Sequence, residues 1–312
     1  MESIIEVQHL SKSYGKKKAI NDLSFAVEEG AFFSFLGPNG AGKSTTIDIL
    51  TTLVQKDTGT VKINGLEIGQ NDAEIRSIIG SVFQRGLLDE KLTVLDNLLI
   101  RGSFYQLSDK ELKNRIDYLS DLIQINEFLS QQYGKLSGGQ KRRADIVRAL
   151  INQPRILFLD EPTAGLDPLS RKILWQTIKD LQKRLSMTVF LTTHYMEEAA
   201  QSDKIAIIDQ GRLVALDTPD NLRASFSTTS VRLYHPTPQL LPRLLNEHYQ
   251  AFEENDVILI QNLTYDKILG ILADNRNEFD GFEVLRGNMD DVFLNITKQL
   301  ESTKDKSERK IN

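Results

Sequence analysis

The chain contains no cysteine, and this absence removes two kinds of architecture. Without thiols, neither a disulfide framework nor a cysteine-ligated zinc site can be built. Histidine is scarce as well, and its scattered positions show no metal-ligand spacing. The four histidines are His9, His194, His235 and His248.

Long apolar runs are also missing. None reaches the roughly 18–20 residues that a helix needs to cross a bilayer. The first residues, MESIIEVQHLSKSYG, lack the apolar core of a signal peptide. We therefore expect the protein to be made and kept in the cytosol, and to need a membrane-spanning partner if it works at a membrane.

The chain has no excess of positive charge, since its net charge is −5. A protein that binds nucleic acid through electrostatics carries a basic surface, so this class of function is disfavoured. The length of 312 residues allows one large domain and a smaller one.

The order of apolar patterns predicts an α/β fold for the first part of the chain. Continuous apolar runs at 155–160 and 187–193 are typical of central parallel strands covered on both faces. A helix should start near Pro168 between them and bury Trp175 in the core. Short strands and turns dominate the N-terminal part, and the pattern becomes helical from about 93 to 150, with a capping box at Ser108 and Glu111.

A small polar segment at 223–230 predicts a domain boundary after residue 225. We expect a first domain at 1–225, with a helical subdomain at about 85–150, and a small α+β domain at 226–300. In this second domain the expected order is βαββαβ followed by a helix at 289–300, which suggests a split βαβ unit. The charged tail at 301–312 should be disordered.

The stretch GPNGAGKST fits the phosphate-binding pattern G-x-x-x-x-G-K-[ST] in full. Its backbone N–H groups would cradle phosphates, Lys43 would add a positive charge, and Ser44 would ligate Mg²⁺. An ordinary glycine turn is the alternative, but the loop follows a strand and opens a helix, as the pattern requires. The residues assigned to nucleotide binding are Gly37, Pro38, Asn39, Gly40, Ala41, Gly42, Lys43, Ser44 and Thr45.

The apolar run ILFLDEP, at 156–162, ends in two carboxylates. At the end of a strand, Asp160 would hold Mg²⁺ through water, and Glu161 would accept a proton from an attacking water. An acidic surface turn is the alternative interpretation. The phosphate loop elsewhere in the chain favours the catalytic one.

A second glycine turn, KLSGGQKRRADIVRAL, runs from 135 to 150. Ser137, Gly138 and Gly139 would open a helix, and a helix N-terminus attracts anions. This turn lies 94 residues after Lys43, beyond the helical insertion. At least two of the three basic residues that follow the turn are expected on a solvated helix face; they are Lys141, Arg142 and Arg143.

Taken together, these motifs resemble those of the ATP-binding cassette (ABC) ATPases, over residues 1 to about 225. The resemblance implies that Tyr14 stacks on adenine and that Gln84 reaches Mg²⁺ and senses a membrane partner. It further implies that His194 contacts the γ-phosphate and that Asp167, near the end of AGLDP, lies at a dimer interface. A surface tyrosine, a polar strand end and a structural histidine remain the plainer alternatives for Tyr14, Gln84 and His194.

The resemblance also answers why one chain carries two phosphate turns. In this family the second turn covers the γ-phosphate held by the other subunit of a head-to-tail dimer. Ser137, Gly138, Gly139 and Gln140 would thus complete a site on a second copy or on a paralogous ATPase. ATP would close the dimer, and hydrolysis would open it.

The segment MDDVFLNITK, at 289–298, resembles the C-terminus of exporter ATPases of the daunorubicin-resistance (ABC-2) type. We therefore predict an ATPase subunit, peripheral on the inner face of the membrane, that powers a separate transmembrane subunit docked near Gln84 and 85–98. The alternative is a soluble cassette acting on nucleic acid or the ribosome. Against it, 94 residues leave no room for a long coiled coil and the chain holds one cassette. Import ranks below export, and the substrate stays open.

Overall fold

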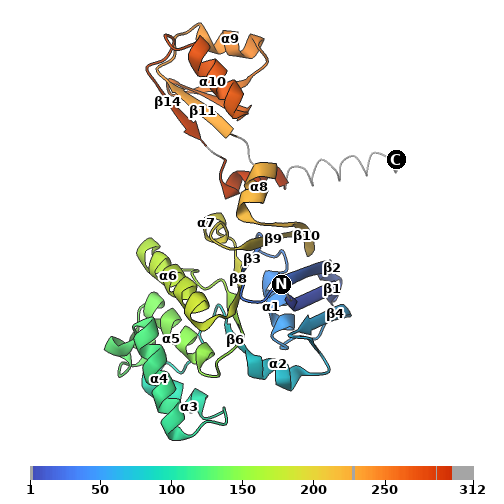
Figure 1. Cartoon of the computed structure of the whole chain (residues 1–312), viewed down its shortest axis with the longest axis vertical. Helices are drawn as coiled ribbons and strands as arrows, with labels where there is room; N and C mark the ends of the chain where they lie inside the picture. Colours follow the sequence, from blue (N-terminus) through green and yellow to red (C-terminus); the bar gives the residue numbers. More distant parts are fainter. Residues whose placement is uncertain (1–2, 227–228, 286, 297–312) are drawn as a thin grey trace. The chain divides into compact units, whose positions relative to one another are not determined.

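The computed structural model describes residues 3–226, 229–285 and 287–296. The chain divides into two compact units, Met1–Leu216 and Asp217 onward (Figure 1). The sequence placed the boundary after residue 225, whereas the structure groups 217–225 with the second unit. Among the described residues, no helix is both long enough and apolar enough to cross a membrane.

A six-stranded sheet forms the centre of the first unit, in the order β10-β9-β3-β8-β7-β6. The pairs β3–β8, β3–β9, β7–β8 and β6–β7 are parallel, which confirms the parallel centre expected from the continuous apolar runs. The strands are β3 (Phe32–Leu36), β6 (Ile79–Val82), β7 (Ile156–Asp160), β8 (Thr188–Thr193), β9 (Lys204–Asp209) and β10 (Arg212–Asp217).

The central sheet is buried on both faces because successive side chains of its strands point to opposite sides. On one face Phe32 stacks on Trp175 of α6 (Pro168–Leu185), with ring centroids 5.2 Å apart. Trp175 is buried, as predicted for a core residue. On the other face Phe33 and Phe190 stack at 5.4 Å inside a larger aromatic cluster.

The N-terminal strands form a separate antiparallel sheet in the order β2-β1-β4-β5. Its buried residues join the same core cluster as Phe33 and Phe190, so this sheet covers that face together with α1. The elements are β1 (Ser3–Tyr14), β2 (Lys17–Glu28), α1 (Lys43–Leu50), β4 (Thr58–Ile63), β5 (Leu66–Glu67) and α2 (Asp72–Ile78). The predicted N-terminal antiparallel strands are thus present.

The segment from 93 to 150 is helical, as its pattern predicts. Its second α-helix begins with the expected capping box: Glu111 N donates to Ser108 Oγ at 3.3 Å, and Ser108 N donates to Glu111 Oε2 at 2.9 Å. The helices are α3 (Val94–Gly102), α4 (Asp109–Ile123), η1 (Asn126–Phe128), η2 (Tyr133–Lys135) and α5 (Gly138–Leu150). A short helix, α7 (Met196–Ala199), follows β8.

The second unit contains a four-stranded antiparallel sheet in the order β12-β13-β11-β14. The chain order βαββαβ agrees with the expected split βαβ pattern. Its elements are α8 (Pro219–Phe226), β11 (Thr229–Tyr234), α9 (Leu240–Asn246), β12 (Gln250–Glu254), β13 (Val257–Leu263), α10 (Tyr265–Asp274) and β14 (Gly281–Leu285).

The chain is helical again over 289–296. Met289, Val292 and Ile296 of this helix are buried. Asn295 Nδ2 donates to the carbonyl of Phe226 at 2.8 Å and links this helix to the end of α8. The rest of the predicted helix and the tail at 301–312 lie outside the described residues.

Candidate functional site

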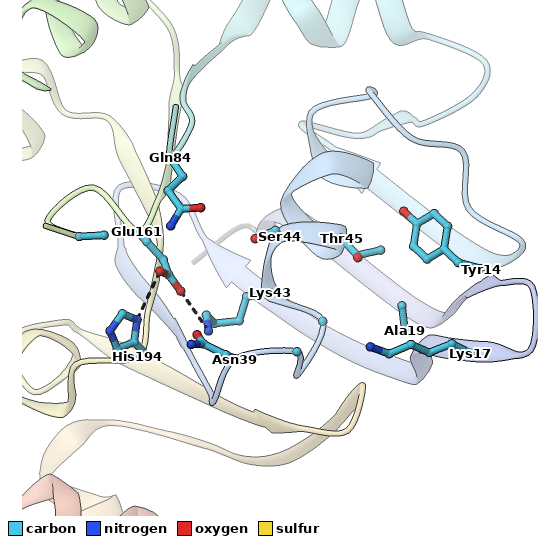
Figure 2. A pocket seen from close by; sticks show the side chains of 13 residues that line it. Tyr14, Lys17, Ala19, Asn39, Lys43, Ser44, Thr45, Gln84, Glu161 and His194 are labelled. Carbon is cyan, nitrogen blue, oxygen red and sulfur yellow. Dashed lines mark ion pairs between the residues drawn. The ribbon is translucent and has the colours of Figure 1, made fainter. Parts of the chain in front are cut away.

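A cavity of about 530 Å³ opens beside the phosphate loop (Figure 2). This volume is in the range of small-molecule sites. Segments far apart in the sequence meet there: the end of β1, the loop before α1, the segment after β6, and the residues that follow β7 and β8. The predicted residues that line it are Tyr14, Asn39, Gly40, Gly42, Lys43, Ser44, Thr45, Gln84, Glu161 and His194.

The phosphate loop is held in a shape that only glycine permits at one point. Gly42 has a φ of 106°, and a Cβ atom there would lie 2.6 Å from the carbonyl oxygen of Ala19. Lys43 is buried, and its Nζ donates to the carbonyls of Gly37 at 2.8 Å and Pro38 at 3.1 Å. The first residues of α1 face the cavity, where their free N–H groups favour a phosphate.

Asp160, the last residue of β7, brings a carboxylate to the serine of the phosphate loop. Its Oδ1 accepts hydrogen bonds from Thr192 Oγ1 at 2.6 Å and from Ser44 Oγ at 3.4 Å. A carboxylate beside a hydroxyl is the kind of oxygen donor set that suits Mg²⁺. In the described part of the chain, no group of three or more histidine, cysteine or acidic residues is placed to hold a metal ion.

Glu161 lies between a lysine and a histidine. Its Oε1 is 3.1 Å from Lys43 Nζ, and its Oε2 is 3.3 Å from His194 Nδ1 (Figure 2). Glu161 adopts a backbone φ of 45°, which is uncommon for residues other than glycine. Its N–H donates to the carbonyl of Thr192 at 3.2 Å and to Thr192 Oγ1 at 3.0 Å, so β8 holds this turn. Such enforced geometry is typical of functional sites.

Tyr14 ends β1 at the open side of the cavity, and half of its surface is exposed. An exposed aromatic ring there can stack on a planar base. Lys17 and Ala19 lie on the same wall, and Ala164 lines the cavity as well. The sequence interpretation missed these three. The basic run at 16–18, one residue beyond Tyr14, was the signal that could have identified Lys17.

Gln84 follows β6 and projects into the cavity (Figure 2). Its backbone carbonyl accepts from Arg142 at 3.1 Å, and that of Phe83 accepts from the same guanidinium at 2.5 Å. Arg148 donates to the carbonyl of Ser81. Two arginines of α5 therefore hold the backbone that carries Gln84.

Of the three basic residues that follow the second glycine turn, Arg142 is the one that is buried. Lys141 and Arg143 are half-buried, but Arg142 is only 8% exposed. Burial lowers the pKa of Arg142, while the carboxylate of Asp145 acts in the opposite direction. The bonds to Phe83 and Gln84 compensate for burying this cation.

The second glycine turn lies outside the cavity of its own chain. Ser137 caps α5 in a reciprocal arrangement: Gln140 N donates to Ser137 Oγ at 3.3 Å, and Ser137 N donates to Gln140 Oε1 at 2.9 Å. Gly138 and Gly139 follow in the first turn of the helix. The structure thus separates these residues from the phosphate loop, and their predicted role toward a second subunit stays a prediction.

Asp167 is likewise absent from the cavity. It caps α6 by accepting a hydrogen bond from Ser170 N at 3.0 Å, and the bonds from Ser170 lower the pKa of its carboxyl.

A titratable residue that the sequence interpretation missed is Asp48 on α1. Burial raises the pKa of its carboxyl, and the charge of Asp160 raises it further.

A comparison with protein families matches residues 20–164 to the ABC transporter family. The chain is 33% identical to the daunorubicin resistance ATP-binding protein DrrA2 of Streptomyces coeruleorubidus, over 94% of each chain. It is 34% identical to the Nod factor export ATP-binding protein I of Rhizobium sp. (strain N33), over 94% of this chain and 96% of the relative.

Among solved structures, the chain resembles an ATP-binding cassette captured as a dimer in a post-hydrolysis state with ADP and phosphate. The TM-score is 0.63 and the identity 29%, and the match covers 69% of this chain and 98% of the other.

Proposed function

The chain belongs to the ABC transporter family and is an ATP-binding, ATP-hydrolysing subunit of it; from that premise we propose that it powers export through a separate transmembrane subunit. Two similar proteins are named for drug resistance and for Nod factor export, and both align along nearly their whole length. That likeness favours export over import, and over a cassette acting on nucleic acid or the ribosome. The substrate class remains that of an exported small molecule or lipid.

We assign the binding roles by position in the cavity. Tyr14 stacks on the adenine ring, and the backbone of Gly37–Thr45 with Lys43 binds the phosphates. Ser44, Asp160 and Gln84 would hold Mg²⁺, which when bound would neutralise charge on the phosphate oxygens. These residues therefore fix the orientation of the terminal phosphate toward Glu161.

The observation that carries the proposal is the placement of Glu161 between Lys43 and His194. A carboxylate there can accept a proton from a water that attacks the terminal phosphate. His194, on the opposite side of Glu161 from Lys43, would contact the same phosphate and orient the water.

We propose that two chains, or this chain and a paralogue, pair head to tail. Ser137, Gly138, Gly139 and Gln140 would then cover the nucleotide of the partner, with Asp167 close to the same interface. Two features support this arrangement: the turn begins a capped helix, whose N-terminus favours an anion, and it lies outside the cavity of its own chain. A similar cassette was solved as a dimer.

The surface beside Gln84 is suited to a membrane partner. Along α3 and just beyond it, large apolar side chains are exposed; they are Leu95, Leu99, Ile100 and Phe104. Arg101 donates to the carbonyl of Leu87 at 2.8 Å, which joins α3 to the segment after Gln84. We propose that the transmembrane subunit docks here, so that the ATPase works peripherally at the inner face of the membrane.

The two phosphate turns can be tested by mixing variants. A Lys43→Ala chain and a Ser137→Arg chain each form homodimers in which both sites are damaged. A mixed dimer places both faults in one site and leaves the other intact, so ATP hydrolysis should reappear on mixing.

The control is to mix each variant with itself, with dimer formation followed by size-exclusion chromatography. If mixed dimers form and stay inactive, then either the turns act within one chain or the two sites cannot hydrolyse ATP singly.

A further inference from the structure

Glu198 is a buried carboxylate outside the cavity, on the short helix α7. It is only 3% exposed, and each of its oxygens accepts a hydrogen bond from a threonine. Thr163 Oγ1 donates to Oε1 at 2.6 Å, and Thr193 Oγ1 donates to Oε2 at 2.8 Å. Both hydroxyls are therefore oriented by one carboxylate.

The two threonines belong to the two loops that carry the catalytic pair. Thr163 lies two residues after Glu161, and Thr193 immediately precedes His194. Thr193 Oγ1 also accepts from Tyr195 N at 2.9 Å, so His194 lies within a turn pinned on both sides. Glu198 thus joins Thr163 and Thr193, which lie 30 residues apart in the chain.

The surroundings of Glu198 offset the cost of burying its charge. Hydrogen bonds to an ionised carboxylate are stronger than those between neutral groups. Arg171 of α6 places its Nε 3.7 Å from Glu198 Oε1 and its guanidinium 4.1 Å from the centre of the Tyr195 ring. The adjacent Glu197 is exposed and provides a natural comparison.

We propose that Glu198 is a positioning residue that sets the separation of Glu161 and His194, now 3.3 Å between Oε2 and Nδ1. The inference rests on the catalytic roles proposed for those two residues. Glu198 does not line the cavity. It therefore acts only through Thr163, in the loop that carries Glu161, and through Thr193, which precedes His194. Its loss should affect the rate of hydrolysis and leave nucleotide binding intact.

The test compares Glu198→Ala with Glu197→Ala in the full-length chain. Thr163→Val and Thr193→Val are near-isosteric variants that each remove one bond to Glu198, and Thr193→Val also removes the bond from Tyr195 N. For Glu198→Ala we expect kcat to fall about 10- to 100-fold, since a displacement of about 1 Å can cost 10²-fold. KM for ATP should stay within about twofold of the parent value. The rise in melting temperature on adding ATP should stay within about one degree of the parent's. Glu197→Ala should match the parent.

A double-mutant cycle separates positioning from general loss of structure. In a His194→Ala background, Glu198→Ala should cost little more, because the group that it orients is already gone. Equal, additive losses in both backgrounds would overturn the proposal, as would a parallel loss of ATP binding.

The reference variants identify which idea fails. Normal hydrolysis by Glu161→Gln and His194→Ala would refute the proposed function, and the inference with it. Strong losses in those two with a normal Glu198→Ala would refute the positioning role alone.

Discussion

The two units of the chain differ in what they bury. In the described residues of the first unit, the buried side chains include Lys43, Arg142, Asp145, Asp160 and Glu198. The only buried polar side chain described in the second unit is Asn275. The core of the second unit is otherwise apolar, and its ion pairs, such as Arg232–Glu283 and Arg243–Glu278, lie at the surface.

This difference shows that the first unit gives up folding free energy to hold charged groups at its functional site. Burying charge costs free energy unless partners compensate. Lys43 lines the nucleotide cavity, and Asp160 accepts a hydrogen bond from Ser44, which lines it too. Arg142 and Glu198 hold segments that carry lining residues, whereas Asp145 accepts a hydrogen bond from Tyr133 away from the cavity. The core of the second unit is apolar and serves packing. Substitutions in the first unit should therefore change ATP hydrolysis, and core substitutions in the second unit should change unfolding.

Glu161→Gln should have the largest effect, and it should break the chemistry of the first unit while sparing the second. The amide keeps the shape but cannot take a proton, so kcat should fall about 10²–10⁴-fold, as for other lost general bases. ATP binding should persist. Steady-state hydrolysis and equilibrium titration with nucleotide measure the two quantities.

The exposed Glu74 on α2 provides the control for that substitution. Glu74→Gln should behave as the parent does. Hydrolysis by Glu161→Gln at a near-parental rate would remove Glu161 from the mechanism.

Ile260→Ala should act on the second unit instead. Ile260 is fully buried in the core of that unit, and such truncations cost about 2–5 kcal/mol of folding free energy. We expect a transition at lower denaturant concentration that belongs to residues 217 onward, with ATP hydrolysis unchanged. Urea unfolding followed by limited proteolysis would assign the transition to one unit.

Phe252→Ala is the matched control, because Phe252 is 59% exposed on β12. Phe252→Ala should leave the unfolding transitions of the two units at the parental denaturant concentrations. A single transition that shifts as a whole in Ile260→Ala would mean that the two units unfold together, and the comparison between them would fail.

Asp48→Asn should have the smallest effect, and it depends on pH. Because the folded state raises the pKa of this carboxyl, the protonated form is favoured by folding. The contribution of Asp48 to stability is therefore fully present below its ordinary pKa of about 3.9 and is lost as pH rises through the raised value. The amide should stabilise the protein at neutral pH, by no more than about 0.5 kcal/mol.

The measurement for that substitution is the melting temperature between pH 3.5 and 8. The gain from Asp48→Asn should vanish at the acidic end, while the exposed Asp117→Asn should show no such trend. A gain that persists at pH 3.5 would contradict the assignment to the charge of Asp48.

Much of the fold followed from patterns that are local in the sequence. The apolar runs identified β7 and β8, the capping box identified the start of α4, and glycine spacing identified the phosphate loop. Each of these signals depends on residues within a few positions of one another. The cavity residues from separate loops were found by resemblance to a family, since their proximity is a property of the sheet.

The contacts that sequence reasoning missed join distant segments. Three adjacent basic residues begin α5, and Arg142 is the buried one because it contacts the carbonyl of Phe83, which lies 59 residues earlier. Glu197 and Glu198 are identical in type and adjacent, and only the phase of α7 against Thr163 decides which one is buried. No local periodicity carries that information.

The two arginines of α5 also have a mechanical consequence. They grip the strand end that carries Gln84 at three carbonyls, those of Ser81, Phe83 and Gln84. With a rise of about 1.5 Å per residue, these grips lie about 7 Å and 16 Å along the helix from Ser137. Because two arginines fix α5 to the segment that carries Gln84, a displacement of that segment would move the helix as well. The Ser137 turn at the N-terminus of α5 would be displaced with it.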